Sequence, residues 1–222
     1  MYMIHTCPKR EWYVSKLLLP SMYEQGITDD EILIFEDLIG EGVLESCMHS
    51  FASIKTKNGH TWHLQDDVVL CRDFAERTKE LDKTEDCIIC GFASEYDKHD
   101  KDKQEYVTPK DMWFSFPCIR IPNALARECA DWYDTIKDTP EYEYIRSIKK
   151  HDDLMFKEHF LKDREDVKVK NLIPNLVDHV DYLIGGSLVN PNRQSKVVRS
   201  LYWEDADIIS DLKAKLNCID KL

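Results

Sequence analysis

This 222-residue sequence lacks long apolar runs, contains little glycine, and has fewer basic than acidic residues. Its apolar stretches are only a few residues long, so no segment is expected to span a bilayer. The first ten residues lack the basic start and long apolar centre of a signal peptide, which favours a cytoplasmic protein. Because no Pro- or Gly-rich linker divides the chain, we expect one domain over residues 1–222.

The charge balance and the cysteines argue against two further classes. A formal net charge of −12 argues against broad, non-specific binding to nucleic acid, which depends on Lys and Arg neutralising phosphates. Cys87 and Cys90 form a C-x-x-C, but no second pair stands at zinc-ribbon spacing. In a strand these two sulfurs point to opposite faces, so a buried strand is favoured over a zinc or redox site.

Apolar runs alternate with helical patterns along the first hundred residues. This alternation predicts an α/β fold with a mostly parallel central sheet flanked by helices. The expected strands are Tyr2–Cys7, Ile32–Phe35, the run from Thr61, Cys87–Phe92, extended pieces within Trp113–Pro122, and a late extended region, Val167–Val180, in which Pro174 disfavours a central strand. The expected helices are Glu11–Tyr23, interrupted by Pro20, then Val43–Ile54, Arg72–Leu81, Asn123–Tyr133, Leu154–Leu161 and a C-terminal tail. Asp97–Glu105 reads as a charged loop.

Polar clusters follow the first three predicted strands. In parallel sheets ligands bind at the carboxyl ends of the strands, so the clusters Thr6–Arg10, Glu36-Asp37 and Gln65–Asp67 are expected along one rim. The adjacent carboxylates of Asp66 and Asp67 are costly at the end of a buried strand unless a cation or a substrate uses them. Mg²⁺ or Mn²⁺ suits such oxygen ligands. The alternative is a surface turn that holds two aspartates.

The order of these segments resembles the nucleotide-sugar half of GT-A fold glycosyltransferases. The resemblance rests on Thr-Cys-Pro-Lys-Arg-Glu after the first strand, Ile-Leu-Ile-Phe-Glu-Asp in the second, and Trp-His-Leu-Gln-Asp-Asp in the third. The family's acidic "DxD" motif ends a strand at this point, whereas this chain has Gln-Asp-Asp. His151 to Phe156 resembles the helix start that carries the general base of inverting members. Pro174 to His179 and Gly185 to Leu188 are similar to the end segment of small bacterial and phage members.

The resemblance implies a GT-A-like division of the chain and a set of roles. The nucleotide-sugar half is expected at about 1–95, the acceptor and catalytic half at about 96–190, and a C-terminal lid or tail at about 190–222. Asp67 is the expected metal ligand, with His179 as a further ligand or, alternatively, a hydrogen-bonded strand-end His. Asp153 is the expected general base, with Asp152 in reserve, although both residues are also suited to capping the helix. The expected donor-binding residues are Thr6, Arg10, Glu36, Asp37, Gln65, Asp66, Arg193, Lys196 and Arg199.

The predicted function is a metal-dependent glycosyltransferase. It takes a sugar from a nucleoside diphosphate, uses Mn²⁺ or Mg²⁺, and transfers the sugar to an acceptor hydroxyl with inversion. The acceptor is either a surface glycan or a hydroxymethylated base of phage DNA, and a phage-encoded enzyme acts in the host cytoplasm. Two alternatives stay open. A nucleotidyltransferase uses the same metal and acids but usually has a Gly-rich phosphate loop after the first strand, where this chain has Pro8-Lys9-Arg10. The other alternative is a non-catalytic binding protein.

Overall fold

A computed structural model of the chain describes residues 1–84, 86–94, 105–106, 115–148, 152–188, 200 and 202–219. The strands are β1 (Tyr2–Thr6), β2 (Ile32–Glu36), β3 (His60–Gln65), β4 (Val68–Leu70), β5 (Ile88–Cys90), β6 (Glu105–Tyr106), β7 (Cys118–Pro122), β8 (Val169–Asn171) and β9 (Val177–His179). The helices are α1 (Glu11–Tyr13), α2 (Leu19–Glu24), α3 (Val43–Ala52), α4 (Phe74–Leu81), α5 (Asn123–Ile136), α6 (Pro140–Ile148), α7 (Asp152–Met155) and α8 (Ala206–Ile219).

Within the described residues, one large sheet has the strand order β2-β1-β3-β7-β5-β8-β6. β2, β1 and β3 pair in parallel, as do β5 and β8, while β7 runs antiparallel to both of its neighbours. β6 is antiparallel to β8, so five of the seven strands point the same way. The expected α/β fold with a mostly parallel sheet flanked by helices is therefore confirmed. The sheet also takes strands from both predicted halves of the chain.

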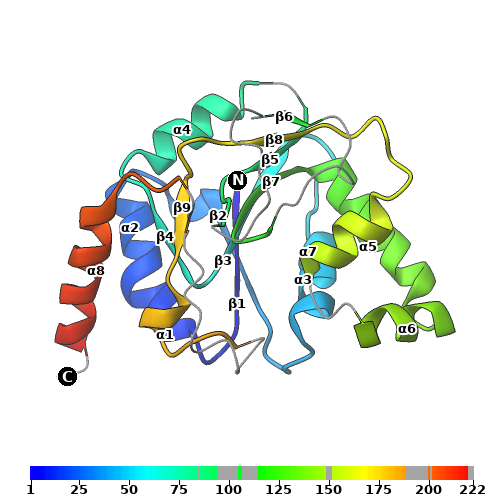
Figure 1. Ribbon diagram of the computed structural model, residues 1–222, viewed down its shortest axis with the longest axis horizontal. Coiled ribbons are helices and arrows are strands. Elements are labelled where there is room, and N and C mark those ends of the chain that lie inside the picture. The colour runs from blue at the N-terminus through cyan, green and yellow to red at the C-terminus, as the bar shows by residue number, and fades with distance from the viewer. Residues whose placement is uncertain are drawn as a thin grey trace.

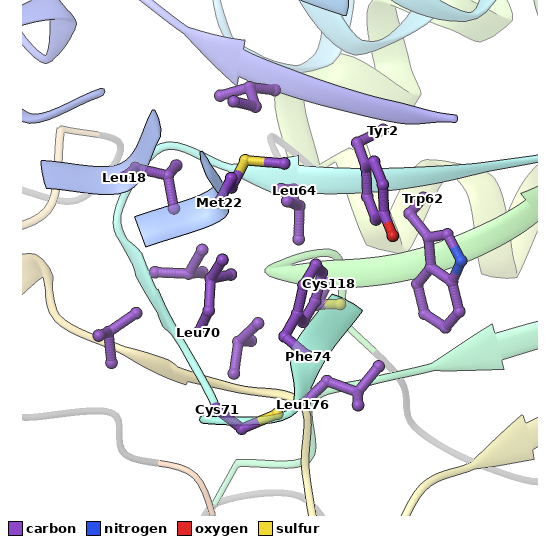
Figure 2. Close-up of a cluster of buried hydrophobic side chains, with 14 of the residues drawn as sticks. Tyr2, Leu18, Met22, Trp62, Leu64, Leu70, Cys71, Phe74, Cys118 and Leu176 are labelled. Atoms are coloured by element: carbon purple, nitrogen blue, oxygen red, sulfur yellow. The ribbon is translucent and has the colours of Figure 1, made fainter. Parts of the chain in front are cut away.

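Helices cover both faces of this sheet because the strand residues alternate between two apolar cores. Tyr2 and Ile4 of β1 join one core with residues of α2, α4 and α8, and Met3 between them joins the other with residues of α3, α5 and α6. Figure 1 shows the two helical layers on either side of β1. The first core is drawn in Figure 2, where Tyr2, Trp62 and Phe74 lie close together.

Proline acts differently at the two places where the sequence drew attention to it. Around Pro20 the chain stays helical, because a π-helical turn, Val14–Leu18, leads into α2 and Pro20 occupies the first turn of that helix. Pro174 instead lies between β8, which belongs to the large sheet, and β9, which pairs with β4 in a separate small sheet. The late extended region is thus two short strands in different sheets.

The structure can also be compared with the predictions for the cysteine pair and for membrane-spanning helices. Cys87 and Cys90 are buried, at 3% and 1% exposure, as a buried strand predicts. In the part of the chain that the structure describes, no helix is long and apolar enough to cross a bilayer. Trp113, Phe114 and most of the charged stretch from residue 97 lie outside the described residues.

Candidate active site

The carboxyl ends of β1, β2 and β3 meet at one edge of the sheet because these three strands are parallel and adjacent. A cleft of about 1020 Å³ opens there. Its walls come from the turn after β1, the loop between β2 and α3, the turn after β3, α6 and the start of α7. They include Thr6, Cys7, Lys9, Asp37, Glu41, Glu45, Gln65, Asp66, Asp67, Glu143, Arg146, Asp152, Ser187 and Leu188. In Figure 1, β1 runs toward the lower edge of the sheet, with α1 on one side of its carboxyl end and α3 and α7 on the other.

The turn after β3 places the paired acids. β3 ends at Gln65, the chain turns through Asp66 and Asp67, and β4 then leaves to pair antiparallel with β9. The register sets Val68 opposite His179, and the Val180 N–H donates to the Asp67 carbonyl at 2.8 Å. This pairing holds Asp67 and His179 side by side, although they are more than one hundred positions apart in the sequence. The small sheet is the element that brings His179 to Asp67.

Asp67, His179 and Asp181 form a compact cluster. Their potential ligand atoms lie within 4.8 Å of one another. His179 Nε2 lies 3.3 Å from Asp67 Oδ2, and His179 Nδ1 lies 3.3 Å from Asp181 Oδ1. The two carboxylates therefore face opposite nitrogens of one imidazole ring. An ion that takes Nε2 together with Asp67 leaves Asp181 to orient the ring from behind, the arrangement common around metal-bound histidines.

Asp67 and His179 stabilise each other's charged forms. Burial by itself raises the pKa of Asp67, but the neighbouring His179 charge and hydrogen bond bring it below its ordinary value. Burial by itself lowers the pKa of His179, and the attraction of Asp67 with hydrogen bonds to Asp181 and Asp67 raises it to about 10. Without a metal, a protonated His179 thus bridges two carboxylates. A divalent ion would take the place of that proton, because a histidine ligand must be neutral.

The residues present fit a divalent cation. Asp67 Oδ1 is buried and finds no hydrogen-bond partner among the described residues, so its lone pairs are available to an ion. One carboxylate and one imidazole, with space left in a polar cleft, is a donor set that keeps positions open for substrate oxygens. The structure places Asp67 and His179, the two metal ligands expected from the sequence, with Oδ2 and Nε2 3.3 Å apart.

Asp66 is the other acid of this turn, and it lines the cleft together with Thr6 and Cys7. Burial, and then the charge of Asp67, raise the pKa of Asp66 to about 7. Asp66 therefore holds a proton more readily than Asp67 does.

Asp152 lies on the opposite wall, where α7 begins. It lines the cleft and is 7% exposed, whereas Asp153 is not among the lining residues. The Asp153 carboxylate accepts the N–H of Leu154 at 2.8 Å. Burial, and then the charge of Asp153, raise the pKa of Asp152 to about 8. Of the two acids considered as the base, Asp152 has the better access to a substrate.

Two of the predicted donor-binding residues have structural partners that the sequence did not indicate. Arg10 is 1% exposed, and its guanidinium donates to the backbone carbonyls of Ile184 and Gly186. It does not line the cleft and instead fastens the end of β1 to the segment after Asp181.

Asp37 does line the cleft, but its carboxylate accepts the backbone N–H groups of Gly40, Glu41 and Gly42 at 2.8–3.2 Å. It therefore organises the loop after β2. Glu36 ends β2 opposite Thr6 and is not a lining residue. Arg193, Lys196 and Arg199 lie outside the described residues.

The sequence interpretation missed Asp181 and Arg146. Asp181 begins a short 3-10 helix just after β9, and only the pairing of β4 with β9 shows that it belongs to the metal cluster. Arg146 lines the cleft from α6, where its Nε lies 3.0 Å from Glu45 Oε1. Tyr142, one helical turn earlier, donates to the same oxygen at 2.9 Å.

Neither a scan against protein-family models nor a search of the curated proteins finds a match. Solved structures give distant likenesses. A197 from STIV is 14% identical with a TM-score of 0.45, over 80% of this chain and 84% of that one. A protein described as a glucose-1-phosphate thymidylyltransferase from Bacillus anthracis, in complex with a sucrose, is 7% identical with a TM-score of 0.46, over 80% and 88%. The galactosyltransferase LgtC, in complex with donor and acceptor sugar analogues, is 10% identical with a TM-score of 0.41, over 97% and 96%.

A glycosyltransferase and a nucleotidyltransferase, the two enzyme classes considered from the sequence, are both among these structures. At such identities and TM-scores the likeness carries no conclusion about this chain. It does not choose between the two activities, so the assignment of roles rests on the geometry of the cleft.

Proposed function

We propose that this protein is a metal-dependent glycosyltransferase that moves a sugar from a nucleoside diphosphate to an acceptor hydroxyl. The observation that carries the proposal is the division of the cleft into two acidic walls. Asp67 lines one wall, here called the metal wall, with His179 Nε2 at 3.3 Å from its carboxylate, and Asp152 lines the opposite wall, here called the acceptor wall. Transfer to a hydroxyl needs both a stabilised leaving group and a proton acceptor, and the two walls offer one each.

The leaving-group side uses the metal cluster. A bound divalent ion supplies Lewis-acid stabilisation of the departing diphosphate. Asp67 and His179 would hold it, and Asp181 keeps His179 Nε2 turned toward Asp67. Asp66, beside Asp67 on the cleft wall, would contact ribose or sugar hydroxyls. Lys9, an exposed cation on the same side of the cleft, supports the negative charge of the diphosphate.

The acceptor side uses Asp152. Its carboxylate takes the proton of the acceptor hydroxyl while that oxygen forms a bond to the anomeric carbon. The bond from the anomeric carbon to the diphosphate oxygen breaks at the same time, and its electron pair leaves with the diphosphate. A base on the wall opposite the leaving group predicts inversion. Asp153, the first choice from the sequence, stays in the proposal as the alternative base, and the acceptor belongs to a glycan or to a hydroxymethylated DNA base.

A panel assay tests this function. Nucleoside-diphosphate sugars are incubated with the protein and Mn²⁺, Mg²⁺ or EDTA, and release of free nucleoside diphosphate is followed by chromatography beside thermal stabilisation. At least one donor should stabilise the protein and be slowly hydrolysed only with metal, and adding a glycan or hydroxymethylated DNA should accelerate its use. If no donor stabilises the protein and none is hydrolysed, the proposal is rejected. Pyrophosphate release from a nucleoside triphosphate and a sugar 1-phosphate would establish the nucleotidyltransferase instead.

A further inference from the structure

Arg146 is one of two Lys or Arg side chains among the described residues that line the cleft, the other being Lys9 in the turn after β1. It lies on α6, whose Tyr142 and Ile145 pack in the same apolar core as residues of α3 and α7. Figure 1 shows these three helices together on one side of β1. Arg146 therefore belongs to the acceptor wall, with Asp152.

A row of side chains behind Arg146 holds its guanidinium in place. The Arg146 Nε lies 3.0 Å from Glu45 Oε1, and the Tyr142 hydroxyl donates to that same oxygen at 2.9 Å. The Tyr142 ring packs edge-on against Tyr133, with ring centroids 5.6 Å apart, and both residues are buried. The buried tyrosines therefore fix the carboxylate of Glu45, and Glu45 in turn fixes the Nε end of Arg146.

The rest of the guanidinium is available to a ligand. The Arg146 side chain is 52% exposed, and Glu45 is its one ion-pair partner among the described residues. A guanidinium carries five N–H donors in a planar fork, so four remain on Nη1 and Nη2 when Nε–H is taken. Two parallel N–H groups match two oxygens of a carboxylate or a phosphate. Because an exposed ion pair adds little to stability, the arrangement is better suited to presenting an oriented donor to a ligand.

We propose that Arg146 is a specificity-determining residue that binds one anionic group of the acceptor, a carboxylate or a phosphate carried by a sugar. By holding that group, Arg146 brings the acceptor hydroxyl to the wall that carries Asp152. The role in transfer rests on the proposed function, but the binding of an acidic sugar by Arg146 does not.

The charges around Arg146 favour a single anion over a polyanion. Glu143, one helical turn earlier on α6, and Glu41 line the same cleft. A nucleic acid would bring a row of phosphates against these carboxylates, and the chain as a whole has a formal net charge of −12. An acidic sugar brings only the group that Arg146 takes. Of a glycan and modified DNA, an acidic glycan is therefore the acceptor that this wall fits.

Binding of small sugars to the metal-free protein tests the contact. Methyl glucuronide and methyl glucoside 6-phosphate are compared with neutral methyl glucoside by saturation-transfer NMR in EDTA. Both acidic sugars should bind the parent at least about tenfold more tightly, because only they form charge-assisted hydrogen bonds with the guanidinium. Arg146→Gln should remove this preference, and Arg146→Lys, which keeps the charge without the fork, should retain part of it. The double variant Glu45→Gln/Arg146→Gln should also lack the preference, although it does not leave the Glu45 charge unpaired.

Arg72→Gln is the matched control, because it removes an arginine that pairs with Asp207 and does not line the cleft, and it should bind all three sugars as the parent does. In a transfer assay, Arg146→Gln should raise the KM of an acidic acceptor by about tenfold with kcat little changed. The proposal is overturned if the acidic sugars bind the parent no better than methyl glucoside, or if the double variant keeps the preference. It is also overturned if hydroxymethylated DNA binds more tightly than the acidic sugars and loses that advantage in Arg146→Gln. If no donor is ever used, the proposed function fails, while the sugar titration still decides the role of Arg146.

Discussion

Asp67 and Asp152 lie on opposite walls of the cleft, and their pKa values are shifted in opposite directions. Asp67 faces His179 at 3.3 Å, and its pKa lies below the ordinary value. Asp152 has no such cation among the described residues, and burial beside Asp153 raises its pKa to about 8. One aspartate is therefore kept ionised to receive a cation, and the other keeps a proton near neutral pH.

This contrast shows how a fold assigns roles to carboxyl groups. Pairs of titratable groups whose environments push their pKa values apart mark the divided roles in an active site. Here the division comes from two different elements, since the small β4–β9 sheet brings a histidine to one acid and α7 presents the other acid unaided. Substitutions on each wall test whether the two aspartates have these separate roles.

The largest expected effect is on the metal wall. Asp67→Asn removes the charge that faces His179, so Mn²⁺ affinity should fall by more than about 100-fold, and transfer should be abolished, while the circular dichroism spectrum stays that of the parent. Calorimetric titration with Mn²⁺ measures the affinity. Asp138→Asn, an exposed aspartate on another surface, serves as the control and should bind as before. Full affinity in Asp67→Asn would remove Asp67 from the site.

On the acceptor wall, Asp152→Asn should lower the transfer rate by about 10²- to 10⁴-fold with Mn²⁺ affinity unchanged, because it removes the proton acceptor and not the ion's ligands. In the parent protein the rate should rise with pH and level off above about pH 8, as Asp152 loses its proton. Asp153→Asn is the matched comparison. If that variant loses the activity and Asp152→Asn keeps it, the base is Asp153.

A smaller effect is expected behind the metal. Asp181 touches the far nitrogen of His179, so Asp181→Asn should weaken Mn²⁺ binding by about 10- to 100-fold without abolishing it. The intermediate value is informative, because a direct ligand and an orienting residue differ in size of effect. A loss as complete as that of Asp67→Asn would make Asp181 a ligand.

A last effect concerns the free energy of unfolding. Folded Asp152 holds its proton up to about pH 8, whereas the unfolded chain releases it near the ordinary value of 3.8. The contribution of this group is therefore full below pH 3.8 and is lost as pH rises through 8, with a slope of at most about 1.4 kcal/mol per pH unit. Asp152→Asn should flatten that part of the curve in urea unfolding at pH 5 to 8. Parallel curves for the two proteins would mean that Asp152 is ionised when folded.

Much of the site's location could be predicted from the sequence, because apolar runs ending in polar clusters mark strand ends, and parallel strands bring their ends together. Thr6, Gln65 and Asp66 line one cleft for that reason. The role of Arg10 could not be predicted, because the backbone carbonyls that it contacts are 174 and 176 residues away in the sequence. No local sequence pattern indicates such a contact. Asp181 was missed for the same reason, because its contact with His179 depends on a three-residue strand pairing.

The most direct test of a cation on the metal wall is anomalous X-ray diffraction from crystals grown with Mn²⁺ and a nucleoside diphosphate. The account predicts a manganese peak between the Asp67 carboxylate and His179 Nε2, with diphosphate oxygens in its open positions and Asp181 bonded to Nδ1. A peak elsewhere in the cleft, or diphosphate bound there with no manganese beside Asp67, would contradict it.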